Sequence, residues 1–457
     1  MSHRYPSRSV RRPVCVFGAA AAVAICAVLS AAAQTRPAPS ITREITQTYA
    51  RLLAAPAIRR LLDDIRADDA RTLAEHRQLT EIEAPPFAEK TRAEVMLQRF
   101  RALGLTDAAI DAEGNVVGLR KGVGGGPVLV VSAHLDTVFP AGTDVHIKER
   151  EGRLYAPGIA DDTRGLAVLL AWIKALNENR VQTTGDILFV ANVGEEGLGD
   201  LRGMKRVFKD RPGIDGMVGI EPSPMNSITS IGTGSHRYEV TFRGPGGHSF
   251  EAFGAVSAIH AMGRALAKIA EIRTPAEPKT TFTVGTVTGG TSVNTIAGDA
   301  KMQIDMRSND MASLLALEKQ VLATLPVAVA EENARWGADT PAKQVGFTTK
   351  LIGDRPAGET APSAVIVQAA VASLAAFGGG GAPMLSGSST DANVPMSLAI
   401  PAIIVGGGGE SLGWHTRDEW FDPKDEWKGA QQSLTTILGL VGVQGVVEPI
   451  LRTRAPR

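Results

Sequence analysis

The stretch GDILFVANVGEEGLGD, Gly185 to Asp200, decides the fold that we expect of this chain. It begins with an apolar run of the length of a buried strand and ends in two adjacent carboxylates, Glu195 and Glu196, between glycines. Two like charges side by side at the end of a buried strand are costly unless a cation lies close to them. The stretch therefore predicts a core strand with a cationic group at its carboxyl end.

Further apolar strands surround this one. PVLVVSAH at 127–134, GIDGMVGIEP at 213–222 and AIPAIIVGG at 399–407 have the same character, and a helix is expected at 165–177. Strands that alternate with helices favour an α/β sheet whose functional loops lie at the strand ends. We therefore expect the chemistry of this chain at one edge of such a sheet.

A second unit interrupts the α/β pattern. Strands are expected at 235–244, 280–290, 299–308 and 343–353, with helices at 255–272 and 311–336. The order β-α-β-β-α-β is that of a split, ferredoxin-like module. Because 457 residues exceed one ordinary core, a two-domain protein is also the expectation from length.

The first 33 residues predict a signal peptide. Four arginines precede an apolar run, Val14 to Leu29, and small residues follow it. The run is shorter than the roughly 20 residues of a membrane-spanning helix, so we expect cleavage, a periplasmic or secreted protein and no membrane anchor afterwards. Cys15 and Cys26 both lie in this segment, which leaves no disulfide or thiol chemistry for the mature chain.

Composition excludes one class of partner. The chain is 44% hydrophobic and 21% charged, as in soluble globular proteins, and its 48 basic residues balance its 48 acidic residues. It has no basic stripe, so we expect no binding of nucleic acid.

Five side chains at strand-to-loop junctions are candidate metal ligands. They are His134, Asp161, Glu196, Glu221 and His415. Each alone has an ordinary explanation; the Asp161-Asp162 pair, for example, also suits the start of a helix. Together, two histidines and three carboxylates suit zinc or a similar ion.

Two more residues, Glu195 and Asp136, adjoin this set. The adjacent side chains of Glu195 and Glu196 cannot both face one point, so one can bind a metal while the other acts as a base. Asp136 lies two residues after His134 on an extended chain and points the same way, so its carboxylate can fix the imidazole.

The ordered motifs HLD, ADD, GEEG, IEP and WHT, with GPGGHS in the second unit, resemble one known family. It is the zinc-dependent aminohydrolases of metallopeptidase family twenty, which includes glutamate carboxypeptidases, peptidase T, dipeptidases and aminoacylases. The resemblance implies a mixed-sheet zinc-hydrolase domain of the α/β class with an inserted ferredoxin-like lid or dimerisation domain. The expected parts are a signal peptide at 1–33, the catalytic domain at 34–234 and 354–457, and the inserted domain at 235–353.

The resemblance also implies roles for the ligand set. One divalent ion is held by His134, Asp161 and Glu221, and a second by Asp161, Glu196 and His415, with Asp161 as the bridge. Zinc is the expected metal, and cobalt and manganese share these ligands. Glu195 is then the general base, Asp136 orients His134, and the peptide bond after Asp161 is often cis in the family.

Residues outside the ligand set gain roles in the same way. The resemblance implies that His248 reaches the active site of a partner subunit, that Asn294 and Arg307 hold the carboxylate end of the substrate, and that Gly387 and Ser388 line the pocket. A loop histidine, a turn asparagine and a surface arginine are the ordinary alternatives. Many relatives have lysine after the paired aspartates, where this chain has Thr163-Arg164. His76 and His146 are expected at the surface.

The expected function is hydrolysis of amide or peptide bonds in small peptides by an exopeptidase, peptidase T-like or carboxypeptidase-like, that acts as a homodimer. An N-acyl amino acid amidohydrolase is the alternative. A non-catalytic peptide-binding protein is less favoured, because it is expected to lose a ligand or the base. Zinc aminopeptidases with a similar ligand set lack the inserted unit. The sequence has no G-x-S-x-G elbow before a helix, so a serine hydrolase is not supported.

Overall fold

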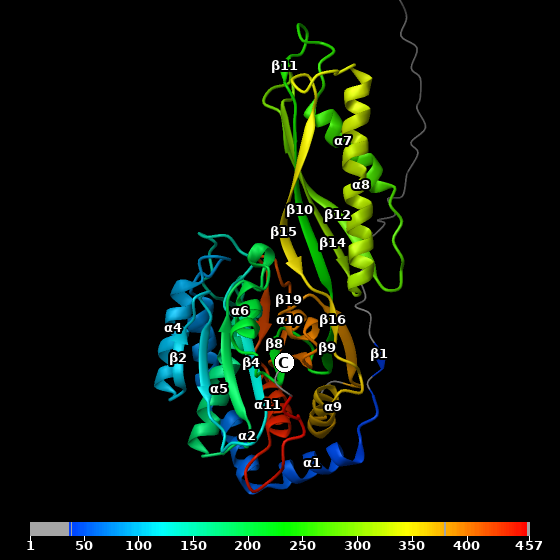
Figure 1. Cartoon of the computed structure of the whole chain (residues 1–457). Coiled ribbons are helices and arrows are strands. Elements are labelled where there is room, and N and C mark those ends of the chain that lie inside the picture. Colours follow the sequence, from blue (N-terminus) through cyan, green and yellow to red (C-terminus); the bar gives the residue numbers. More distant parts are fainter. Residues whose placement is uncertain (1–35, 38, 379–380, 455–457) are drawn as a thin grey trace, which may run out of the picture. The chain divides into compact units, whose positions relative to one another are not determined.

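The computed structural model describes residues 36–37, 39–378 and 381–454 (Figure 1). The segment predicted as a signal peptide, 1–33, lies outside the described residues.

A mixed sheet of ten strands forms the centre of the described chain. Nine of them follow in the order β1 (Arg36–Pro37), β17 (Met384–Ser388), β9 (Ser227–Gly232), β18 (Ala402–Gly406), β8 (Gly216–Glu221), β4 (Val128–His134), β7 (Asp186–Asn192), β3 (Val116–Arg120) and β2 (Thr106–Ile110), and β16 (Gly358–Glu359) pairs with β9. Strand β4 runs parallel to β7 and β8, and β8 parallel to β18, whereas β3 is antiparallel to β7. The predicted mixed-sheet α/β fold is therefore confirmed.

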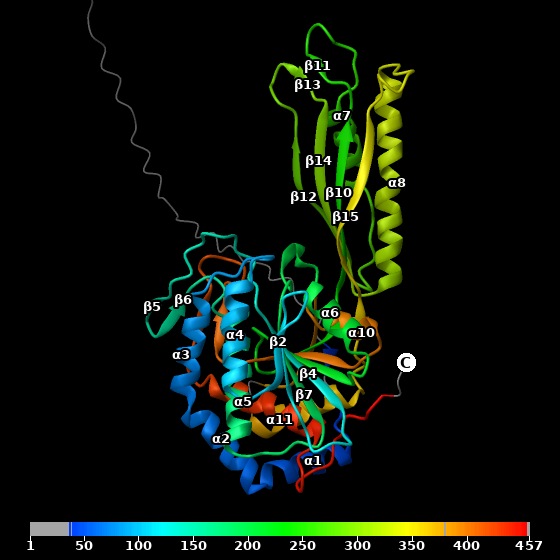
Figure 2. The ribbon, with the colours of Figure 1, turned by 60° about the vertical axis from the view of Figure 1, so that its left-hand side comes forward.

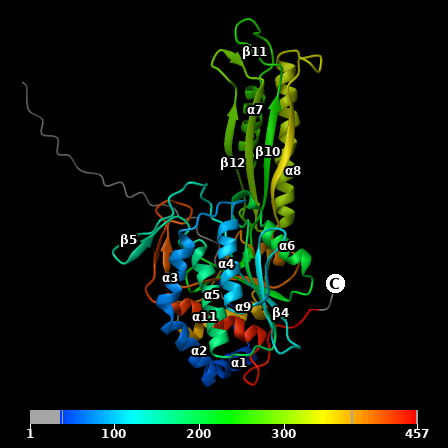
Figure 3. The same ribbon diagram turned by 90° about the vertical axis from the view of Figure 1, so that its left-hand side faces the viewer.

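Helices cover both faces of this sheet (Figures 2 and 3). One side carries α1 (Arg43–Ala54), α2 (Pro56–Ala67), α4 (Lys90–Ala102), α5 (Thr163–Glu178), α9 (Val365–Phe377) and α11 (Trp427–Val441), and the other α6 (Arg202–Asp210) and α10 (Asn393–Ser397). Helix α3 (Asp69–Thr80) packs on α5.

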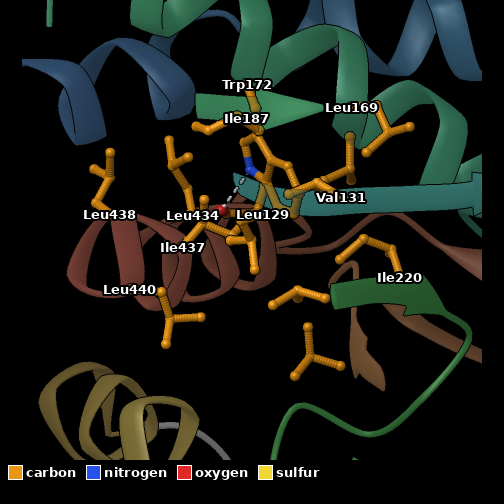
Figure 4. Packing of buried hydrophobic residues seen from close by; sticks show 14 of the residues in the cluster. Leu129, Val131, Leu169, Trp172, Ile187, Ile220, Leu434, Ile437, Leu438 and Leu440 are labelled. Carbon is orange, nitrogen blue, oxygen red and sulfur yellow. Dashed lines mark hydrogen bonds between the residues drawn. The ribbon is translucent and has the colours of Figure 1, made fainter. Parts of the chain in front are cut away.

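Strand β4 shows why both faces are covered. Its side chains alternate, so Leu129 and Val131 join the apolar cluster under α5 and α11, while Val130 joins the cluster under α6. The first cluster includes Trp172, whose indole N–H donates to the carbonyl of Ala430 at 2.8 Å (Figure 4). A strand that is apolar on both faces reads as a continuous hydrophobic run, and this is the pattern seen in its sequence.

A four-stranded antiparallel sheet interrupts the chain between β9 and β16. Its order is β12 (Thr280–Gly289), β14 (Asp299–Ser308), β10 (Gly234–Arg243) and β15 (Gly346–Arg355). Helices α7 (Ala258–Ala270) and α8 (Met311–Arg335) pack on one face through a core that includes Phe242, Ile304 and Leu317. In chain order the elements are β10, α7, β12, β14, α8 and β15; the role of this unit as a lid or dimerisation domain stays a prediction.

Two smaller sheets complete the described elements. The first joins β19 (Glu410–Leu412), β20 (Trp420–Asp422), β6 (Arg153–Tyr155) and β5 (Lys148–Arg150), and the second joins β11 (Gly247–His248) and β13 (Thr295–Ile296). Pairing of β20 with β6 brings the loop before α5 next to the loop between β19 and β20. These two loops carry Asp161 and His415, so the sheet helps to assemble the site.

Candidate metal centre

Three parallel strands place four of the candidate side chains at one edge of the central sheet. Strand β4 ends at His134, β8 ends at Glu221, and Glu195 and Glu196 follow β7 directly. Because β7 and β8 both run parallel to β4, their carboxyl ends meet at the same edge. This is the arrangement that the apolar runs with terminal carboxylates predicted.

Asp161 lies between the two histidines. One of its carboxylate oxygens, Oδ1, is 2.9 Å from Nε2 of His134, and the other, Oδ2, is 3.2 Å from Nε2 of His415. The same nitrogen of His415 is 3.1 Å from Oε1 of Glu196. Each oxygen of Asp161 thus faces a different histidine, as a carboxylate that bridges two ions does. The peptide bond between Asp161 and Asp162 is cis, as the resemblance implied.

Among the residues that the structure describes, two groups of donor atoms are compact enough for a metal ion. Those of Asp161, Glu196 and His415 lie within 4.8 Å of one another, and so do those of His134, Glu195 and Glu196. The first group is the set predicted for one ion. In the second, His134 is grouped with the paired glutamates rather than with Asp161 and Glu221, although its Nε2 also contacts Asp161.

Electrostatics favours a cation at this edge. Burial raises the pKa of Glu195 well above its usual range, against the attraction of Arg355, and it raises the pKa of Glu221 in the same way, with the charge of Glu195 adding to the effect. The Oε1 atom of Glu221 is shielded from solvent and has no hydrogen-bond partner in the described chain. Buried carboxylates and imidazoles with an unsatisfied oxygen are a donor set that fits divalent metal ions.

Asp136 supports both His134 and the paired glutamates. Its backbone carbonyl accepts a hydrogen bond from Nδ1 of His134 at 2.9 Å, which leaves Nε2 facing the centre. Its carboxylate accepts from the backbone N–H groups of Glu195 at 3.1 Å and Glu196 at 2.8 Å, and lies 3.8 Å from Nδ1 of His134. Asp136 therefore orients His134, as predicted, but mainly through its backbone carbonyl and not through its carboxylate. The carboxylate instead holds the backbone of Glu195 and Glu196.

Asp162 caps a helix, which is the ordinary explanation that the sequence analysis gave for the aspartate pair. Its carboxylate caps α5 by accepting from the N–H of Gly165 at 3.2 Å, and it accepts from the N–H of His134 at 2.9 Å. Neighbouring aspartates therefore have different tasks, since Asp161 faces the histidines and Asp162 holds the backbone around them.

Arg355 is a residue of the site that sequence reasoning missed. It ends β15, is buried, and places Nη1 3.3 Å from Oε1 of Glu195, while Nη2 donates to the backbone carbonyl of Glu195. Nη1 also lies 3.3 Å from the hydroxyl of Ser389. The loop that follows β17 therefore adjoins Glu195 through Arg355. In the sequence, GDRPAG carries no periodic or motif signal that separates this arginine from one at the surface.

The other predicted residues lie apart from the ligand set. His248 on β11 is exposed, and its Nδ1 accepts from the N–H of Phe250 at 3.3 Å. The carbonyl of Asn294 accepts from the N–H of Ser249, so these residues form one tip of the inserted unit. Arg307 on β14 pairs with Asp305 at 2.7 Å. Within the described residues, no hydrogen bond or ion pair joins His248, Asn294 or Arg307 to the five candidate ligands.

Gly387 and Ser388 end β17. They pair with Ile231 and Gly232 of β9, and the carbonyl of Ser388 accepts from the N–H of Thr233 at 2.8 Å. Their connection to the centre is indirect, through the neighbouring Ser389 and its contact with Arg355. As pocket-lining residues they stay predictions.

His76 corrects one expectation. It was expected at the surface, but its side chain is buried, its Nε2 donates to the carbonyl of Ile159 at 2.5 Å and its ring packs 4.9 Å from that of Phe421. The surface expectation was wrong because β20, remote in sequence, covers this face of α3. Burial lowers the pKa of His76 to about 3. His146 is exposed, as expected.

Comparisons with known proteins define the class of this chain. The model of peptidase family M20/M25/M40 matches residues 130–438, more than half of the sequence, so the protein belongs to that family of peptidases and amidohydrolases. The crystal structure of aminopeptidase PepT from Bacillus cereus is similar with a TM-score of 0.65 and 22% identity, and covers 81% of this chain and 98% of that chain.

Two curated proteins are similar in sequence. The uncharacterized protein YqjE of Bacillus subtilis is 26% identical over 391 residues, which are 81% of this chain and 98% of YqjE. Carboxypeptidase G2 of a Pseudomonas species is 35% identical over 139 residues, which are 30% of this chain and 33% of that enzyme. YqjE is thus similar along nearly its whole length, and its name assigns it no activity.

The predicted export is overturned by these findings. Periplasmic or secreted localisation rested on residues 1–33, which lie outside the described residues. The family match begins only at residue 130, and the relatives named above give no positive evidence for a signal peptide. A basic start followed by an apolar run was therefore insufficient ground for assigning a compartment.

Proposed function

We propose that this protein is a dinuclear metal hydrolase that cleaves an amide or peptide bond next to a free terminus of a small peptide. The observation that carries the proposal is the position of Asp161, with one oxygen on His134 and the other on His415, beside the paired glutamates. His134, Asp161 and Glu221 would hold one ion, and Asp161, Glu196 and His415 the other. The nitrogen and carboxylate donors favour zinc.

The residues of the chain divide the work of hydrolysis. When bound, the two ions supply Lewis acidity, which polarises the scissile carbonyl and lowers the pKa of a water molecule. Glu195 is the base that takes the proton from the attacking water and passes it to the leaving nitrogen. Asp136 holds the backbone of both glutamates, so the base keeps its place relative to Glu196. Arg355 pairs with the carboxylate of Glu195 and so opposes the effect of burial on its ionisation.

A small substrate with a free carboxylate is the proposed class. Arg307 and Asn294 would receive that carboxylate, by the resemblance. Aminopeptidase PepT and carboxypeptidase G2 differ in the terminus that their names specify, so exopeptidases of either kind are consistent with the similarity. Hydrolysis of N-acyl amino acids is the second candidate, because these compounds also present an amide bond next to a free carboxylate.

A homodimer is part of the proposal. Phe250 and Phe253, which follow His248 in the chain, are 86% and 78% exposed, and Val293 is fully exposed next to Asn294. Large apolar side chains gathered at one tip favour a partner surface. A second copy of the chain would cover them and bring its own His248 to the centre of the first.

Hydrolysis by the purified, metal-supplied protein tests the function. Free-amine di- and tripeptides, N-blocked peptides and N-acyl amino acids would be compared, with Glu195→Gln as the variant. We expect turnover that a chelator abolishes and that Glu195→Gln reduces by at least a thousandfold, on the order of 4 kcal/mol in the barrier. Turnover that survives in Glu195→Gln would contradict the assignment of the base.

Subunit mixing tests the role of His248. Glu195→Gln and His248→Ala would each be inactive alone, and their mixture should regain up to about a quarter of the activity if His248 acts in the partner's site. A mixture that stays inactive while the chains exchange partners would contradict action across the dimer.

A further inference from the structure

Two loops meet at the candidate centre, where Asp161 of one loop contacts His415 of the other. The loop at 156–161 precedes α5 and ends in Asp161, and the loop at 413–419 joins β19 to β20 and carries His415. Neither loop belongs to the central sheet, so the strand ends alone do not fix where Asp161 and His415 lie. The pairing of β20 with β6 brings the two loops together, and a contact between the loops themselves must set the distance between Asp161 and His415.

Glu419 makes that contact. It is fully buried, and its Oε1 atom accepts hydrogen bonds from the backbone N–H groups of Ala160 at 2.7 Å and Asp161 at 3.0 Å. Its Oε2 atom accepts from the N–H of Gly158 at 2.9 Å, and its backbone carbonyl accepts from the N–H of Ala156 at 3.2 Å. One side chain in the His415 loop therefore satisfies three backbone donors of the Asp161 loop.

The chemistry of this contact is specific to a carboxylate. An ionised carboxylate is an acceptor only, with two oxygens that can receive several N–H donors, and such charge-assisted hydrogen bonds are about twice as strong as neutral ones. A glutamine in the same place would turn an N–H₂ group towards at least one backbone N–H.

We infer that Glu419 is a positioning residue for the metal centre, which sets Asp161 relative to His415 by binding the backbone of the 158–161 loop. It is not itself a ligand, because both of its oxygens are taken up by backbone N–H groups. The inference rests on the proposed function only in that Asp161 and His415 hold metal. Supporting contacts of this kind typically change metal affinity by about 10- to 100-fold.

The test is metal affinity in Glu419→Gln. Apoprotein would be titrated with cobalt(II), with the visible absorption of the bound ion as the readout, and thermal unfolding would be followed on the same samples. We expect Glu419→Gln to bind cobalt at least tenfold more weakly than the wild type, with an altered spectrum. The matched control is Glu426→Gln, which removes another buried glutamate, paired with Arg164 and without contact to the 158–161 loop. It should lower the unfolding temperature and leave the cobalt affinity unchanged.

A second variant covers the case in which Glu419→Gln does not fold. Glu419→Asp keeps the charge but draws the carboxylate back by one methylene, and the same loss of cobalt affinity is expected. Wild-type affinity and spectrum in either folded variant would overturn the inference, as would an equal loss of affinity in Glu426→Gln. A wild-type protein that hydrolyses nothing but binds cobalt would sink the proposed function alone, whereas one that binds no cobalt would sink both.

Discussion

The guanidinium of Arg355 lies 3.3 Å from the carboxylate of Glu195, and both side chains are buried. Arg355 is the last residue of β15, a strand of the four-stranded sheet, whereas Glu195 follows β7 of the central sheet. A strand of the inserted unit thus ends in a cation that faces the proposed base. The same guanidinium donates to the backbone carbonyl of Glu195, so it fixes the main chain of this residue as well as its charge.

Replacement of Arg355 by alanine should harm both stability and catalysis. It would leave Glu195 as an unpaired buried carboxylate, for which about 3 kcal/mol of unfolding free energy is the expected loss. We also expect kcat to fall, because the base loses its fixed position. Urea unfolding and steady-state kinetics on the best substrate measure the two effects.

Arg237→Ala is the matched control. Arg237 on β10 also donates to this loop, at the carbonyl of Gly197, but it pairs with Asp305 and does not touch the carboxylate of Glu195. The loss of kcat should therefore be smaller than in Arg355→Ala. Equal losses of kcat in the two variants would mean that tethering of the loop, and not pairing with Glu195, is what matters.

Replacement of Glu221 by itself should lower the number of metal ions that the chain retains. Its Oε1 atom has no partner in the described chain, and the group of Asp161, Glu196 and His415 does not include it. We predict that Glu221→Ala retains about one ion per chain where the wild type retains two, because one complete donor set of three remains. Elemental analysis after dialysis against metal-free buffer measures this number. Two ions retained in Glu221→Ala would remove Glu221 from the ligand set.

Strand ends were the part of the site that the sequence could predict. An apolar run followed by a histidine or glutamate locates that side chain at the edge of a sheet, because side-chain alternation and strand length are local properties. This argument placed His134, Glu195, Glu196 and Glu221 together. Asp161 and His415 belonged to the same candidate set, but they lie on loops outside the central sheet, and the division of the five ligands between two ions came only from the resemblance to a known family.

The rest depended on contacts between remote segments. Arg355 and Glu419 are charged residues that one expects at a surface, and they are buried because each meets partners far away in the chain, Glu195 for the first and the 158–161 loop for the second. His76 is covered by Phe421 for the same reason. Single-sequence patterns contain periodicity but not these pairings, so buried charged groups are the ones that such patterns miss.

Arg164 lies at a position where the resemblance led us to expect lysine, and its contacts offer a test of this difference. Its Nη1 atom is 2.5 Å from Oε2 of Glu426, and Nε and Nη2 both donate to the carbonyl of Gly407, at 3.1 and 2.9 Å. Lysine cannot reproduce this fork, since it carries a single ammonium group. We expect Arg164→Lys to lower the free energy of unfolding by about 2 kcal/mol, as for the loss of a charge-assisted hydrogen bond, with little effect on KM. Unfolding in urea measures it, and an unchanged midpoint would show that the guanidinium geometry is not required.

His76 should make the protein sensitive to acid. Its pKa is about 3 in the folded chain because of burial, against 6.5 when exposed. Between these values the unfolded chain binds one proton more than the folded chain, so the free energy of unfolding rises with pH and is lost as the pH falls from 6.5 towards 3. The slope of the free energy of unfolding that comes from this residue is at most about 1.4 kcal/mol per pH unit.

His76→Gln should therefore flatten the pH dependence of unfolding between pH 4 and pH 6, although the variant is less stable than the wild type at pH 7. His146→Gln removes an exposed histidine and should follow the wild-type curve. Parallel curves for wild type and His76→Gln would mean that His76 takes up its proton in the folded state too, through local opening of β20 above the ring.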